Sequence, residues 1–242
     1  MIYLIDGSID GLFTAIFNAY LTKKTPTAVT DGDIQMEIDE EVVEIQTNEE
    51  KAVRVFKKLD KILPPSELEK IFIAIKSGDP CKFTVIFNYL VETINNDYSI
   101  SDNFANPHVF RFDKLVSKIN LEVHRFKGFL RFSKTDNGIY YAKYYPDNDI
   151  NTLLLPHFAK RYKTMPFIIH DLKHNVISAY NNGKTKTVYT ELEPIKTSDE
   201  FEKLFKIYYD TIFIKERKNE KCMLNFMPKR YHKNMPEKNE LI

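Results

Sequence analysis

Basic and aromatic side chains alternate in the block 125–132, and these residue types can hold phosphate groups and stack on unpaired bases. Arg125, Lys127 and Arg131 would contact phosphates, while the phenylalanines between them would offer ring faces. The same alternation is typical of a half-buried strand, whose aromatic side chains face inward and whose arginines face water. The sequence leaves both interpretations of this block open.

A second basic block, 227–233, shows no apolar period and begins beside a proline. It contains Lys229, Arg230, Tyr231 and Lys233. Lysine and arginine bind phosphate oxygens through charge-assisted hydrogen bonds, and an exposed tyrosine can stack on a base. We therefore predict nucleic-acid contacts for these four residues.

Two histidines and two charged residues form a candidate catalytic set. His157 and Arg161 are one helical turn apart, so they share one face of a helix, and His170 and Asp171 follow a predicted strand. Such residues can transfer protons or bind a phosphate. In the structural alternative, His157 is a buried, hydrogen-bonded side chain and Asp171 caps the turn after Ile169.

Asp147 and Asp171, followed by Lys173, also resemble the two carboxylates and the lysine with which PD-(D/E)xK nucleases hold a divalent metal and activate water. The flanking glutamate helix of those enzymes is not evident, and Asp147 can equally be an acid in a turn. A divalent metal is expected only under this nuclease alternative, and no other cofactor is predicted. The chain contains no P-loop, G-x-G-x-x-G or G-x-S-x-G sequence.

The elements that must position these residues follow from hydrophobic periodicity and from turn residues. The N-terminal part is expected to be rich in helices with a short sheet, and Ser8 or Asp10 and Asn48 are candidate helix caps. Extended segments are expected at 2–5 and 26–47, and helices at 12–20, 48–63, 66–76, 81–95 and 108–126.

After Gly128 the pattern changes to a β-hairpin and a small antiparallel sheet packed by helices. The sequence Asn137-Gly138 between two aromatic runs is a strong hairpin signal. A helix is expected at 149–163, strands at 167–169, 176–180 and 185–190, and a further helix at 198–214. The fold class is therefore predicted to be α+β.

Charge is distributed unevenly along the 242 residues, although the net charge is only +1. Residues 1–122 contain 13 Lys and Arg against 20 Asp and Glu, whereas residues 123–242 contain 22 against 14. The turn at Gly78-Asp79-Pro80 divides an acidic region, 1–78, from a basic domain, 79–242. A basic domain favours a polyanionic partner, but two oppositely charged faces that dock against each other would give the same asymmetry.

Composition is that of a folded globular protein, with 43% hydrophobic and 13% aromatic residues. Cys81 and Cys222 are far apart and show no metal-binding spacing, so reduced thiols are expected. The first 20 residues carry two aspartates and no preceding basic residues, which is unlike a signal peptide or a membrane span. We expect a cytoplasmic protein without a membrane partner.

The order of the short blocks resembles a bacterial family described as probable DNA metabolism proteins. The matching blocks are Asp6-Gly7-Ser8, 127–132, Pro146-Asp147, His157-Phe158 with Arg161, Ile169-His170-Asp171, Glu216-Arg217 and 227–231. The resemblance spans the chain and is looser between about 25 and 110. Phe167 stands where the family pattern has tryptophan. The resemblance adds Arg217 to the predicted nucleic-acid-binding residues.

The resemblance implies a domain of unknown function that also occurs fused to uracil-DNA glycosylases and is encoded beside a putative DNA modification or repair radical SAM protein. We therefore expect a nucleic-acid-binding accessory protein of DNA repair or modification, with DNA and that radical SAM protein as partners. Residues 1–78 would bind the protein partner. The alternatives are an enzyme on DNA, either a metal-dependent nuclease or a phosphate-processing hydrolase, and a protein-interaction module without DNA contact.

Overall fold

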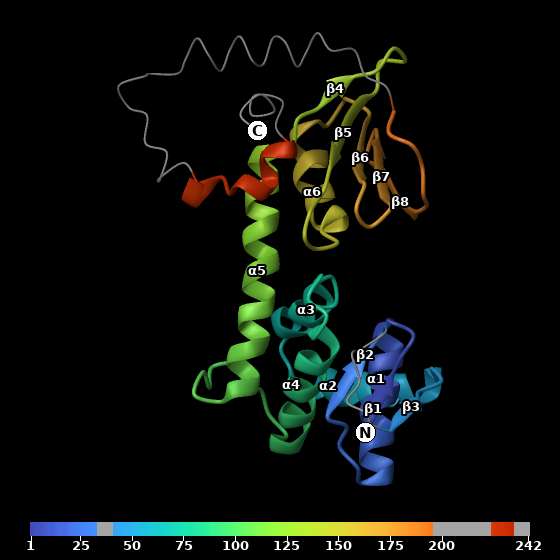
Figure 1. Cartoon of the computed structure of the whole chain (residues 1–242), viewed down its shortest axis with the longest axis vertical. Helices are drawn as coiled ribbons and strands as arrows, with labels where there is room; N and C mark the ends of the chain where they lie inside the picture. Colours follow the sequence, from blue (N-terminus) through green and yellow to red (C-terminus); the bar gives the residue numbers. More distant parts are fainter. Residues whose placement is uncertain (33–40, 196–223, 235–242) are drawn as a thin grey trace. The chain divides into compact units, whose positions relative to one another are not determined.

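A computed structural model describes residues 1–32, 41–195 and 224–234, which contain helices and two small sheets (Figure 1). The predicted α+β class is confirmed. The chain divides into two compact units, Met1–Ile119 and Asn120–Ile242. This division by packing differs from the boundary expected at residues 78 and 79, because the first half of a long helix, α5 (Pro107–Phe129), packs into the first unit's core through Phe112, Leu115 and Val116.

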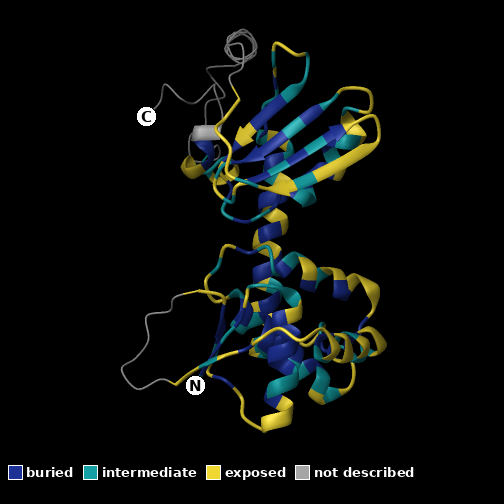
Figure 2. Cartoon of the chain, turned by 90° about the vertical axis from the view of Figure 1, so that its right-hand side faces the viewer, coloured by how far each residue is buried: buried dark blue, intermediate teal, exposed yellow. Residues whose placement is uncertain are grey.

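The first unit contains a three-stranded parallel sheet in the order β2-β1-β3, covered by helices. Its strands are β1 (Ile2–Leu4), β2 (Ala28–Thr30) and β3 (Val42–Glu44). Its helices are α1 (Ile9–Thr22), α2 (Glu49–Ile62), α3 (Pro65–Ala74), α4 (Lys82–Asn96) and the first part of α5. The buried side chains of these elements form its core (Figure 2).

Local sequence explains where the helices of the first unit begin. The Ser8 hydroxyl accepts a hydrogen bond from the Gly11 N–H at 2.9 Å, and the Asn48 side chain accepts one from the Lys51 N–H at 3.0 Å. Each bond satisfies one of the N–H groups that a helix leaves unpaired in its first turn. Both caps were among those predicted.

The second unit contains a five-stranded sheet in the order β4-β5-β6-β7-β8. Its strands are β4 (Ser133–Lys134), β5 (Tyr140–Tyr144), β6 (Phe167–Asp171), β7 (Val176–Asn181) and β8 (Lys184–Tyr189). The predicted hairpin is confirmed as β4 and β5, and Gly138 in its turn has a φ of +78°. Only glycine adopts such a φ without strain.

The sheet is mixed, and the expectation of an antiparallel sheet was wrong at one pairing. β5 and β6 are parallel, whereas the other neighbouring strands are antiparallel. The reason is that α6 (Asn151–Arg161) connects β5 to β6, and a crossover helix returns the chain to the same end of the sheet. α6 packs against β6 and β7.

Most of the block 125–132 is helical and does not form the strand considered above, because α5 continues to Phe129. Only Ser133 and Lys134 pair with β5. Near the C-terminus, a short 3₁₀ helix, η2, spans Lys229–Asn234. The helix expected at 198–214 lies outside the described residues. Within the described ranges, no helix is long and apolar enough to cross a membrane.

Candidate nucleic-acid interface and buried polar clusters

The end of α5 and the end of α6 come together in the second unit through an aromatic contact. The Phe132 ring lies 5.1 Å from the Phe158 ring and 5.2 Å from the Tyr162 ring, measured between centroids. Both contacts are edge-to-face, the arrangement that aromatic pairs prefer. This packing brings the basic residues that precede Phe132 next to those on α6.

These two segments carry cations and no acid. Residues 123–135 and 150–170 contain no Asp or Glu. Burial lowers the pKa of His157, and the charges of Lys127 and Arg161 lower it further. These three residues therefore lie within electrostatic range of one another. We call Lys127, Arg131, His157, Lys160 and Arg161 the α5/α6 basic surface.

Arg125 does not belong to this surface, because its side chain turns toward the C-terminal segment. Its guanidinium lies 5.9 Å from the centroid of the Tyr231 ring and donates a hydrogen bond to the carbonyl of Asn225 at 3.3 Å. Arg131 caps the end of α5 by donating to the Gly128 carbonyl at 2.6 Å.

Tyr231 is a core residue and not an exposed stacking platform, since only 1% of its surface is accessible. Its ring contacts those of Phe126 and Phe129 on α5, with centroids 5.1 Å and 6.0 Å away. Its hydroxyl donates to Glu122 at 3.0 Å. Burial, followed by the charge of Glu122, raises the pKa of Tyr231 to about 12. Tyr231 therefore anchors η2 to α5.

Glu122 is buried at the centre of a polar cluster that extends to the surface. One carboxylate oxygen accepts from the Asp147 N–H at 2.7 Å as well as from Tyr231, and the other accepts from the Asn148 N–H at 2.9 Å and from its side-chain amide. Glu122 is 2% exposed. We call Glu122, Asp147, Asn148, Arg230 and Tyr231 the Glu122 cluster.

Arg230 and Asp147, which were assigned to phosphate and metal binding, contact each other. The Arg230 Nε lies 3.1 Å from an Asp147 carboxylate oxygen. Arg230 also donates to the Tyr231 hydroxyl at 3.1 Å. Lys229 is exposed, Lys233 belongs to η2, and Arg217 lies outside the described residues.

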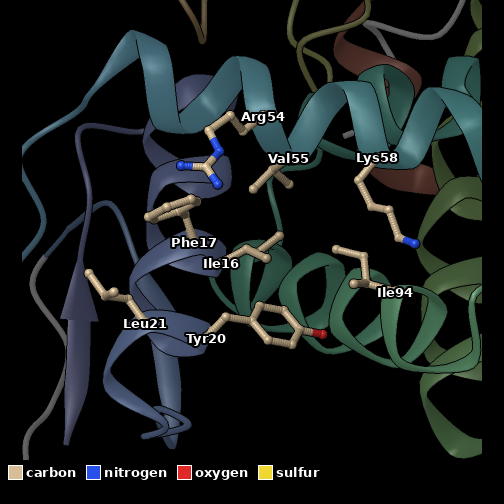
Figure 3. Close-up of a pocket in the computed structure, with 8 residues that line it drawn as sticks. All are labelled: Ile16, Phe17, Tyr20, Leu21, Arg54, Val55, Lys58 and Ile94. Carbon is tan, nitrogen blue, oxygen red and sulfur yellow. The ribbon is translucent and has the colours of Figure 1, made fainter.

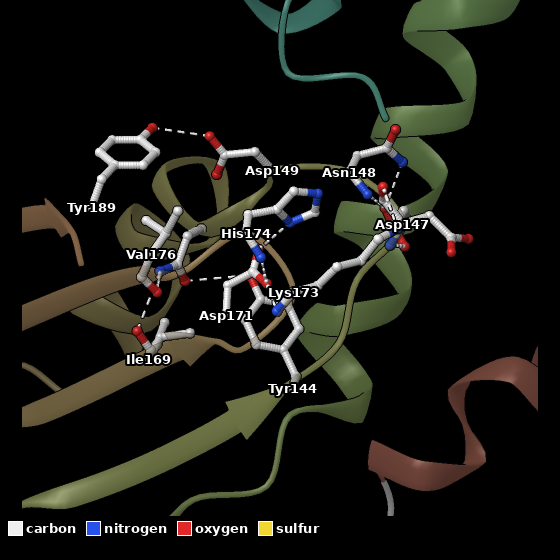
Figure 4. Close-up of polar contacts among 12 residues, drawn as sticks. Tyr144, Asp147, Asn148, Asp149, Ile169, Asp171, Lys173, His174, Val176 and Tyr189 are labelled. Atoms are coloured by element: carbon white, nitrogen blue, oxygen red, sulfur yellow. Dashed lines mark hydrogen bonds and ion pairs between the residues drawn. The ribbon is translucent and has the colours of Figure 1, made fainter. Parts of the chain in front are cut away.

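Asp171 closes the turn that follows β6, as its structural alternative predicted (Figure 4). One carboxylate oxygen accepts from the N–H groups of Lys173 and His174 at 2.9 and 3.1 Å, and the other lies 2.7 Å from the His174 Nδ1. The Lys173 ammonium donates to the Asp147 carbonyl at 3.2 Å, away from both carboxylates. In the described ranges, no group of three or more His, Cys, Asp or Glu is arranged to hold a metal.

His170 lies on the opposite face of the sheet from Asp171, because consecutive strand residues point to opposite sides. Its Nδ1 is 2.8 Å from the Tyr141 hydroxyl, and its buried Nε2 has no hydrogen-bond partner among the described residues. His157 lies on α6 beside Lys127. The four residues of the predicted catalytic set therefore occupy three separate environments.

Burial of His170 predicts a loss of stability in acid. Burial lowers its pKa from the usual 6.5, and the nearby charge of Asp171 offsets this only in part. The unfolded chain then binds more protons at acidic pH, so the stability held above about pH 6.5 decreases as the pH falls below that value. Urea unfolding from about pH 7.5 to 5 should show a smaller decrease for His170→Gln than for the unchanged protein. An equal decrease in both proteins would contradict this assignment.

Sequence reasoning missed Glu122, Asn148 and Asn151. The Asn151 amide donates to the carbonyls of Ile169 and Val176 at 3.3 and 2.9 Å, and its oxygen accepts from Tyr144 at 3.3 Å. A signal was available for Glu122, because it follows Ile119 and precedes Phe126 on the apolar face of α5. A carboxylate at such a position requires buried donors.

The fold and these sites define an α+β protein whose second unit combines a basic surface with a buried carboxylate cluster. Residues 80–237 match a domain of unknown function, DUF4130, and the chain belongs to this family. The match agrees with the uncharacterised domain that the sequence resembles. No curated protein and no solved structure matches the chain.

Proposed function

We propose that this chain is a nucleic-acid-binding accessory protein of DNA repair or modification, and that it acts with a separate catalytic partner. The observation that carries the proposal is the α5/α6 basic surface, where cations from two segments without acids lie together. Such a surface attracts the phosphate backbone of nucleic acids irrespective of sequence.

The balance of charge in the second unit supports the same proposal. Residues 120–242 contain 22 Lys and Arg against 15 Asp and Glu. Lys160 and Arg161 are exposed, and Lys127 and His157 are partly exposed. The role in DNA repair or modification rests on the resemblance of the sequence blocks, and the radical SAM protein remains the partner we propose.

An accessory role is favoured over catalysis by the placement of the predicted catalytic residues. Asp171 is occupied by the turn that it closes, and His170 is buried against Tyr141. Neither lies on the α5/α6 basic surface. Cleavage of DNA by the purified protein would instead support the enzyme alternative.

Removing two cations from the basic surface should weaken DNA binding and reduce its dependence on salt. Each phosphate contact to duplex DNA contributes about 0.9 to the slope of log K against log salt concentration. We therefore expect Lys127→Ala combined with Arg161→Ala to reduce that slope by about two. Fluorescence anisotropy with a labelled duplex, repeated over a series of salt concentrations, measures it.

The matched control removes two exposed cations from β8, Lys184→Ala with Lys186→Ala. This pair has the same change in charge but lies at the other edge of the sheet from β4. Its slope should equal that of the unchanged protein. Equal reductions in both double variants would contradict a localised interface.

A further inference from the structure

The first unit contains an open apolar groove between α1, α2 and α4 (Figure 3). Its volume is about 370 Å³, within the range of known binding sites. The lining residues are Ile16, Phe17, Tyr20, Leu21, Arg54, Val55, Lys58 and Ile94. Tyr20 and Leu21 are 43% and 67% exposed, so apolar surface continues beyond the cavity.

A row of cations on α2 runs past this groove, and two of its members, Arg54 and Lys58, line it. Lys51, Arg54, Lys58 and Lys61 are spaced by three or four residues, so they lie along one face of the helix. We call them the α2 cationic row. The row spans eleven residues, so its ends lie about 15 Å apart along the helix. Residues 1–119 contain 13 Lys and Arg against 19 Asp and Glu, so this row is a local exception to an acidic unit.

The cations of the row differ in how they are held. The Arg54 guanidinium lies 5.0 Å from the centroid of the Phe17 ring and makes no ion pair within the described ranges. Lys51 donates to the Asn18 side chain at 2.9 Å. Lys58 pairs with Asp97, and both side chains are substantially exposed, so a competing carboxylate can replace Asp97 at little cost.

The opposite border of the groove, on α4, carries no cation that faces it. The Tyr20 hydroxyl donates to Asn95 at 2.6 Å, and Glu92 lies close enough that its charge, after burial, raises the pKa of Tyr20. Asp97 is on this side as well. A ligand with acidic groups would therefore orient them toward α2, away from α4.

We propose that this groove binds an amphipathic segment of a partner protein, whose apolar side chains fill the cavity and whose acidic side chains pair with the α2 cationic row. The length of the row favours a peptide over a small amphiphile, because a single anionic head group would engage only one or two of the four cations. Apolar anchors in a groove with charged borders are a common mode of helix recognition. The inference does not depend on DNA binding by the second unit.

Labelled helical peptides of about 15–20 residues test the proposal against the full chain by fluorescence anisotropy. A panel carries leucines at several helical spacings with flanking glutamates, and two control panels replace the glutamates by lysine or the leucines by serine. We expect saturable binding only for peptides that contain both leucine and glutamate. Arg54→Glu should weaken this binding about ten-fold or more, whereas Lys70→Glu on α3, a helix that does not line the groove, should change it less than about two-fold.

Two further substitutions, one inside the groove and one outside it, test the apolar part of the site. Leu21→Ser should weaken binding, while Val53→Ser, which removes an exposed apolar side chain of α2 outside the groove, should not. Equal effects of Arg54→Glu and Lys70→Glu, or equal binding of the lysine panel, would overturn the proposal. So would the absence of saturable binding across the panel, binding of dodecanoate that no peptide displaces, or a dimer of the chain that Leu21→Ser dissociates.

Discussion

Replacing Glu122 by alanine is expected to lower the free energy of unfolding of the second unit by about 3–5 kcal/mol. The substitution removes the acceptor for two backbone N–H groups, the Asn148 amide and the Tyr231 hydroxyl. Three of these donors are buried and the Asp147 N–H is partly buried. Buried donors that lose their partner cost more than the hydrogen bond itself contributes. Urea unfolding followed by circular dichroism measures the loss.

Two further variants distinguish the loss of stability caused by disrupting this cluster from the general effect of a substitution. Tyr231→Phe removes one of the four donors and should cost about 1–2 kcal/mol. Glu69→Ala, at an exposed position of α3, should change the stability by less than about 0.5 kcal/mol. If Glu122→Ala were as stable as Glu69→Ala, the cluster would have no structural role.

Replacing Asp171 by alanine is expected to cost about 2–4 kcal/mol, the second largest loss of stability. Its carboxylate is fully buried and accepts two backbone N–H bonds that define the turn after β6. Asp171→Asn retains an oxygen that can accept these bonds, so its loss should be about 1–2 kcal/mol. Thermal melts of both variants measure the effect.

The same pair of variants distinguishes a structural from a catalytic Asp171. A structural carboxylate predicts that the melting temperature falls more for alanine than for asparagine and that DNA binding by the folded protein is unchanged. A catalytic carboxylate predicts nearly unchanged melting temperatures with loss of activity in a repair or modification assay. The second pattern would contradict our assignment.

The elements that could be predicted from the sequence are those determined by local residues. Helix caps at Ser8 and Asn48 and the turn at Gly138 depend on neighbours a few residues away, and they were found correctly. α5 extends further than predicted. The alternation of basic and aromatic residues after Arg125 is typical of a strand, but it also fits a helix that makes contacts on two sides. The parallel pairing of β5 with β6 depends on where α6 packs, which no local pattern records.

The sites were harder to predict because their contacts join distant parts of the chain. Tyr231 contacts Glu122 across more than a hundred positions, so the tyrosine of the basic block is buried and anchors η2, whereas Lys229 and Arg230 are exposed. His170 and Asp171 are adjacent in sequence, yet strand alternation separates them. Lys127 was predicted to bind nucleic acid and Arg161 to be catalytic, and the Phe132 contacts explain why both lie close enough to affect the pKa of His157.

The most direct test of the central claim is the salt dependence of DNA binding by the unchanged protein. If the α5/α6 basic surface contacts the phosphate backbone through four or more cations, a plot of log K against log salt concentration for a duplex should have a slope of about −3 or steeper. A slope near zero, or no binding to single-stranded or duplex DNA at low salt, would contradict the proposed function.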